Sequence, residues 1–129
     1  MITFPIEFTE FLPGVMRVII ADTVLIGLKY WAKKIGEPLE DFIEAEEKSS
    51  SNGSTFQVYS EGSCYQSIII TRETSLTTLI HEALHASIDI LDHYDIYFDR
   101  TNHEILCRTQ AEILNKIFPE LKKRKIELK

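Results

Sequence analysis

The stretch "TTLIHEALHASIDIL", residues 77 to 91, places two histidines and a glutamate inside an apolar run. Its apolar residues recur at the three- and four-residue spacing of an amphipathic helix. Thr74 or Ser75, just before the run, can cap the first turn, so we expect a helix over 76–92. His81 and His85 would then share one face of that helix, with Cβ atoms about 5 to 6 Å apart.

These two histidines have the spacing of metal ligands. Imidazole nitrogens bind zinc at about 2.0 to 2.1 Å, and positions four apart on a helix can both reach one ion. Glu82 is turned by roughly 100° from His81, so it flanks the ion without binding it and suits a general base. The simpler interpretation is that all three are ordinary polar residues of an amphipathic helix. A predicted strand just before the helix is the context typical of the catalytic motif, and we therefore predict one zinc ion per chain.

A predicted β-hairpin comes before this helix. The segments "TFQVYS" (55–60) and "CYQSIIIT" (64–71) are rich in β-branched and aromatic residues and flank Gly62. We expect them to form antiparallel strands. If strand 64–71 borders the metal cleft, an extended peptide can pair with its backbone.

The N-terminal region predicts a further strand. Apolar residues alternate over 2–8, and Pro5 would confine this strand to the edge of a sheet. Pro13 and Gly14 predict a turn. The segment "RVII" (17–20) is compatible with a short strand or with the start of a helix.

Two helices are expected next. Apolar residues at helical spacing predict a helix over 23–35, with Asp22 as N-cap and with Gly36 and Pro38 as the stop. The segment "LEDFIEAEEK" (39–48) predicts a short acidic helix, followed by a flexible loop.

The last helix is predicted near 102–118, ended by Pro119. The resulting fold class is α+β, a small antiparallel sheet packed with helices. We interpret residues 1–129 as one domain with a motif-bearing core at about 55–118 and a basic tail at 119–129.

Composition limits the function classes. A chain of 129 residues with 44% apolar and 26% charged residues is the size of one globular domain. Its formal charge of −6 argues against a nucleic-acid partner. The basic run 122–125 is the exception, and we interpret it as a solvated helix end or a frayed tail.

The sequence predicts neither a membrane span nor a signal peptide. Arg17 and Asp22 interrupt the longest apolar stretch, and the first ten residues have no basic region or cleavage site. We therefore expect a cytoplasmic protein. Cys64 and Cys107 match no paired-cysteine pattern, so we expect free thiols.

The segment "HEALH" (81–85) resembles the active-site motif of the zincin metallopeptidases. A metzincin would need glycine at Ile88 and histidine at Leu91. Gluzincins instead take a glutamate from the following helix, and Glu104 follows His85 with 18 residues between them. The chain is most similar to a minimal gluzincin, like small predicted peptidases of bacteriophages, over residues 64 to about 118.

The resemblance implies a ligand set of His81, His85 and Glu104, with Glu82 as general base. An alternative role for Glu104 stays open. Thr101 and Glu104 also match a capping box, in which Glu104 would only cap the N-terminus of its helix. His103 is then the rival third ligand.

Further residues are expected around the ion. Asp89 can orient His85, or it can simply face solvent. Arg108 stands where the thermolysin-like enzymes have a supporting aspartate, and it can hold Glu104 by an ion pair. Tyr94, Tyr97 and His103 can steady an oxyanion, and no spacing argument selects among them.

The expected function is zinc-dependent hydrolysis of a peptide or amide bond in a peptide or protein substrate. The alternative is a catalytically silent, zincin-like module that binds a host or viral protein. Oligomeric state stays open.

Overall fold

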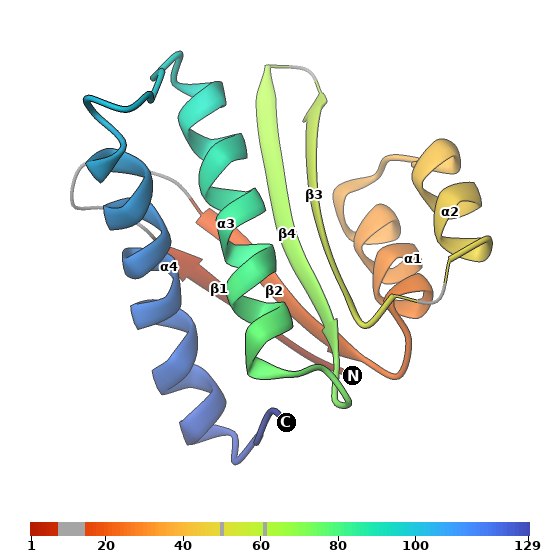
Figure 1. Cartoon of the computed structure of the whole chain (residues 1–129). Coiled ribbons are helices and arrows are strands. Elements are labelled where there is room, and N and C mark those ends of the chain that lie inside the picture. The colour runs from red at the N-terminus through yellow and green to blue at the C-terminus, as the bar shows by residue number, and fades with distance from the viewer. Residues whose placement is uncertain (8–14, 50, 61) are drawn as a thin grey trace.

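The computed structural model describes residues 1–7, 15–49, 51–60 and 62–129, and these ranges form four strands and four helices (Figure 1). In chain order the elements are β1 (Ile2–Glu7), β2 (Val15–Ala21), α1 (Val24–Ile35), α2 (Glu40–Glu47), β3 (Gly53–Ser60), β4 (Ser63–Thr71), α3 (Leu76–His93) and α4 (Glu104–Lys123). The predicted α+β class is confirmed.

The four strands form one sheet in the order β1-β2-β4-β3. β1 pairs with β2 and β3 pairs with β4 in antiparallel register, but β2 and β4 run parallel. The prediction of an antiparallel sheet was therefore wrong for its central pair. The chain passes through α1, α2 and β3 between these two strands, and such a long crossover allows a parallel pair.

Helices cover both faces of this sheet (Figure 1). α3 and α4 lie on one face, where the buried residues of β2 and β4 are Met16, Val18, Ile20, Ile68 and Ile70. α1 and α2 lie on the other face, over the residues in between, among them Ile19 and Ile69. Since both faces of β2 and β4 are buried, these strands show continuous apolar runs rather than alternation.

Most predicted elements of the first half are confirmed. β1 is an edge strand that contains Pro5, and the "RVII" segment belongs to β2. α1 begins at Val24, but its N-cap is Thr23 rather than Asp22, because the Thr23 hydroxyl accepts a hydrogen bond from the Ile26 amide at 3.1 Å. α2 and the β3–β4 hairpin are confirmed. The turn predicted at Pro13-Gly14 lies outside the described residues.

α4 continues through Pro119, so the prediction that this residue ends the helix was wrong. Proline removes one backbone hydrogen bond from a helix interior. Leu121 lies beyond Pro119, is 5% exposed and packs in the same core as the rest of the helix, which offsets that loss. Lys122 and Lys123 are exposed at the helix end, as predicted.

The last six residues are attached to the domain, so of the two interpretations of the basic run, the solvated helix end holds and the frayed tail does not. The Lys129 amide donates to the Thr74 carbonyl at 3.2 Å, and the Leu76 amide donates to the Lys129 carbonyl at 3.3 Å. Ile126 and Leu128 pack against the α3 and α4 side of the core. This apolar burial fixes a segment that its charge alone predicted to be free.

Two other expectations concern the chain as a whole. Among the described residues, none of the helices combines the length and the apolar character that crossing a bilayer would require. Cys64 and Cys107 are free thiols, as predicted.

Candidate metal centre

The helix that carries the motif forms as the sequence predicts. Ser75 is its N-cap, and the Ser75 hydroxyl accepts a hydrogen bond from the Thr78 amide at 3.1 Å. α3 then runs to His93, and its buried side packs on the sheet through Leu79, Ala83, Ala86, Ile90 and Leu91. Of the motif residues, Glu82 lies at the margin of this buried face, and His81 and His85 lie on the exposed side of the helix.

His81 and His85 are both exposed, and their rings meet on the outer side of α3. The two Nε2 atoms are 3.0 Å apart, with ring centroids separated by 4.7 Å. Two imidazole nitrogens bound to one tetrahedral zinc ion lie about 3.3 Å apart, given zinc–nitrogen distances near 2.05 Å. The pair therefore fits a shared ion after a small rotation of the rings. As neutral imidazoles, the same rings can also share one N–H···N hydrogen bond.

Glu82 is buried, at 7% exposed, and it lies against the edge strand β3. The Thr55 hydroxyl donates to Glu82 Oε1 at 2.8 Å, and it also lies 3.0 Å from the Glu82 carbonyl oxygen. Gly53 lets the strand approach, since a Cβ atom there would lie 3.2 Å from Glu82 Cγ. The carboxylate therefore has a fixed orientation beside β3.

The strand next to Glu82 is the outer strand of the hairpin, β3. The condition considered from the sequence, that strand 64–71 offers its backbone to a peptide, is not met, because β4 is internal and pairs with a strand on each side. The edge position belongs to β3. Thr55, which lies on β3 and contacts Glu82, was not identified from the sequence. The sequence indicates a hairpin but not which of its two strands faces outward, because this depends on the distant pairing of β4 with β2.

The third ligand is not brought to the histidine pair. Glu104 is exposed in the first turn of α4, and His103, its N-cap residue, is also exposed. Within the described ranges, no three side chains among His, Cys, Asp and Glu gather closely enough to bind one metal ion. A catalytic zinc site requires three protein ligands, and of the three predicted ones the structure places only His81 and His85 next to each other.

The capping box considered for Glu104 does not form. The Thr101 hydroxyl donates to Asp99 Oδ1 at 2.7 Å, and α4 begins after His103, whose side chain makes no capping hydrogen bond. Glu104 is therefore not required as a capping residue.

Gln110 links α4 to the motif helix. Its Nε2 atom donates to the Ile80 carbonyl at 3.1 Å, beside His81. This contact joins α4 to the turn of α3 that carries His81.

Asp89 lies half-buried one turn beyond His85. Burial raises the pKa of the Asp89 carboxyl and Asp92 raises it further, while His85 acts in the opposite direction. The Asp89 carbonyl oxygen accepts a hydrogen bond from Gln57 Nε2 at 3.1 Å, a second contact between α3 and β3. The coupling to His85 suits an orienting role for the carboxylate.

The remaining predicted residues lie farther out. Tyr94 is the C-cap residue of α3, and its ring packs against His93 with centroids 5.0 Å apart. Tyr97 is 81% exposed in the connection to α4. Arg108 is exposed on α4, one turn after Glu104.

Comparisons of the chain with protein-family models, with curated proteins and with solved structures found no match. The functional interpretation therefore depends on the motif and on the contacts described above.

Proposed function

We propose that this chain is a minimal gluzincin-type metallopeptidase that hydrolyses a peptide or amide bond. One observation carries the proposal: His81 and His85 place their Nε2 atoms 3.0 Å apart on the outer side of α3. Glu82 supports the proposal. It lies on the same helix as the two histidines, and its carboxylate is held beside the edge strand β3. An exposed ligand pair with an adjacent, oriented carboxylate is the arrangement that metal-assisted hydrolysis requires.

A bound zinc ion would supply a Lewis acid for the substrate carbonyl and would lower the pKa of water to about 7. Glu82 then accepts a proton from the attacking water and passes it to the leaving nitrogen. A carboxylate has about four lone-pair sites, so the hydrogen bond from Thr55 leaves Glu82 with acceptor sites for that water. The outer edge of β3 can pair with an extended peptide substrate.

Glu104 is the proposed third ligand, with His103 as the rival. Both residues stand at the start of α4, which Gln110 attaches to α3. The proposal requires this first turn to move toward the histidine pair when the ion binds.

The decisive experiment is the substitution Glu82→Gln in the full chain loaded with zinc. We expect hydrolysis of fluorescent casein and of quenched peptide mixtures to fall by at least about 100-fold, because general-base catalysis contributes that much. Zinc content should not change, since Glu82 does not bind the ion. Glu127→Gln, which removes an exposed carboxylate at the far end of the chain, serves as the control. Equal hydrolysis by the parent and Glu82→Gln would refute the proposal.

A second candidate is a zincin-like binding module without activity, directed at a host or viral protein. It is favoured by the absence of a third ligand beside the histidines in the described ranges. A parent chain that binds zinc or a protein partner but cleaves no peptide in the same assay, with binding unchanged in Glu82→Gln, would support this candidate instead.

A cytoplasmic location belongs to the same proposal, and for a phage-encoded protein this means the host cytoplasm. Free thiols at Cys64 and Cys107 agree with a reducing compartment.

A further inference from the structure

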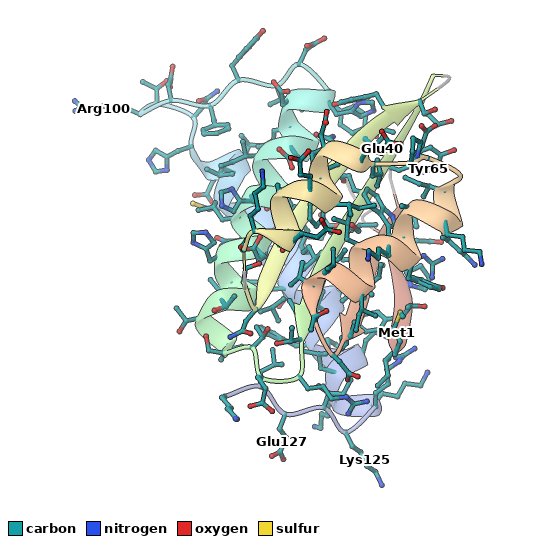
Figure 2. The ribbon with its side chains drawn as sticks, turned by 90° about the vertical axis from the view of Figure 1, so that its right-hand side faces the viewer. Met1, Glu40, Tyr65, Arg100, Lys125 and Glu127 are labelled. Atoms are coloured by element: carbon teal, nitrogen blue, oxygen red, sulfur yellow. The ribbon has the colours of Figure 1, made fainter. Side chains whose placement is uncertain are left out.

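A concave site lies on the opposite face of the sheet from the histidine pair, under the end of α1. It is a cavity of about 500 Å³, within the range typical of small-molecule sites. Figure 2 faces this side of the molecule and labels Tyr65, one of its lining residues, near the end of α1. Among the described residues, nine line it: Val15, Arg17, Trp31, Lys34, Ile35, Ser63, Cys64, Tyr65 and Gln66.

Among the described residues that line this cavity, two are charged, and both are cations, Arg17 and Lys34. Two carboxylates on neighbouring segments, those of Glu37 and Glu7, are not among the described lining residues. Glu37 accepts a hydrogen bond from the Ser60 hydroxyl, and Glu7 is exposed on β1, opposite Val15. In a chain with a formal charge of −6, a cavity whose described lining carries only cationic charges is a local exception. It favours an anionic ligand.

Arg17 is held in place but is not neutralised. Its position in the middle of β2 makes it half-buried, and Nη1 donates to the Thr3 hydroxyl at 3.4 Å. Neither Arg17 nor Lys34 forms an ion pair within the described part of the chain. A guanidinium has five donors in a planar fork that matches the oxygens of a carboxylate or phosphate, and a neutral hydroxyl uses only one of these donors.

Of the other described lining residues, Val15, Trp31, Ile35 and Tyr65 are apolar or aromatic, while Ser63, Cys64 and Gln66 are polar. Trp31 forms part of the buried core of this face, and Ile35 and Tyr65 pack against that core. Val15 is 57% exposed. A ligand that fits this wall carries an apolar group next to its charged one.

We propose that this cavity binds a small organic anion, in which a carboxylate or phosphate is joined to an aromatic or other apolar group. Arg17 binds the oxyanion through its fork, Lys34 adds a second positive charge, and Ile35 and Tyr65 contact the apolar group. This site is independent of the metal centre and of the hydrolysis proposed there.

Trp31 is the single tryptophan of the chain, so its fluorescence reports on the cavity directly. The full chain is titrated with benzoate, with phenyl phosphate and with benzyl alcohol, and calorimetry measures the same affinities independently. We expect benzoate or phenyl phosphate to bind and to change the Trp31 emission, with benzyl alcohol at least about 10-fold weaker. The tighter of the two anions identifies the charged group.

Matched variants identify the residues responsible. Arg17→Gln should weaken anion binding by about 10- to 100-fold, as expected for the loss of charged hydrogen bonds. Lys34→Gln should weaken it by a smaller factor. Lys33→Gln removes the neighbouring charge of the same helix from outside the lining and should leave affinity unchanged. If Arg17→Gln fails to fold, Lys34→Glu on the exposed helix surface replaces it, and this variant should abolish binding.

Three results would overturn the proposal: no binding of either anion up to about 10 mM, a range in which even weak sites are detected; equal binding of benzyl alcohol; or unchanged affinity in both cavity variants.

Discussion

The motif on α3 and the first turn of α4 differ in what holds their glutamates. Glu82 is buried and accepts a hydrogen bond from Thr55 on the neighbouring strand. Glu104 is exposed, and the side chain of the cap residue before it makes no capping hydrogen bond. One part of the proposed site is therefore preorganised, whereas the other has to be organised by the ion. Ordering a preorganised group on ligand binding costs little free energy, whereas ordering a group that must move costs more and weakens binding.

The largest expected effect tests the less organised part. If Glu104 is the third ligand, Glu104→Ala should reduce zinc affinity by more than about 100-fold, because even residues that only orient ligands contribute 10- to 100-fold. His103→Ala, one residue earlier, should leave the affinity unchanged. Competition with a chelator measures both. The reverse pattern would assign the third ligand to His103, and no change in either variant would remove the first turn of α4 from the site.

A smaller effect tests the organised part. Thr55→Val has nearly the same shape and leaves the buried Glu82 carboxylate without this donor, so we expect the free energy of unfolding to fall by about 1 to 3 kcal/mol. Zinc affinity should not change, since the Thr55 hydroxyl contacts Glu82 and not the histidines. Urea denaturation and the chelator assay measure the two quantities.

Thr55→Ser is the matched control, because it keeps the hydroxyl and loses only a methyl group. It should recover most of the stability that Thr55→Val loses. If both variants are equally stable, the hydroxyl does not stabilise Glu82.

Gly53 tests how closely β3 must approach α3. A Cβ atom there would lie 2.9 Å from Thr78 Cγ2 and 3.2 Å from Glu82 Cγ. Gly53→Ala should therefore destabilise the fold by about 1 kcal/mol, the lower end of the range for overpacking, as the Thr78 methyl can shift. Ser54→Ala, whose hydroxyl donates to Glu46 instead, should cost less. Thermal melting compares them, and a Gly53→Ala protein as stable as the parent would mean that the contact is loose.

The smallest effect concerns the connection that leads into α4. Hydrogen bonds from the Thr101 hydroxyl and amide lower the pKa of the exposed Asp99 carboxyl. A lowered pKa in the folded state adds stability above the unfolded pKa of about 3.9, and this stability is lost as the pH falls through the folded value. Asp99→Asn should thus be less stable than the parent at pH 7, with the difference vanishing in acid. A difference that grows on acidification would contradict this assignment.

Local features of the sequence predicted α3 well. Ser75 caps its first turn, and the apolar spacing gave both the helix and the shared face of His81 and His85. Both depend only on residues within a few turns of each other. The same holds for α1 and for the hairpin around Gly62.

Features that depend on distant contacts could not be predicted. The parallel pairing of β2 with β4 puts β3 at the edge, and this pairing joins segments separated by two helices. The burial of Leu121 carries α4 past Pro119, against the local preference of proline. Thr55 and the isolation of Glu104 follow from the packing of whole elements, which no spacing within the sequence encodes.

The central claim is that His81 and His85 bind one metal ion between them. Zinc titration of the parent chain, His81→Ala and His85→Ala, followed by chelator competition, tests it most directly. We expect one zinc ion per parent chain and a loss of affinity of more than about 100-fold in each variant, because each removes a nitrogen bound to the ion. A parent chain that binds no zinc, or variants that bind it as tightly as the parent, would contradict the claim.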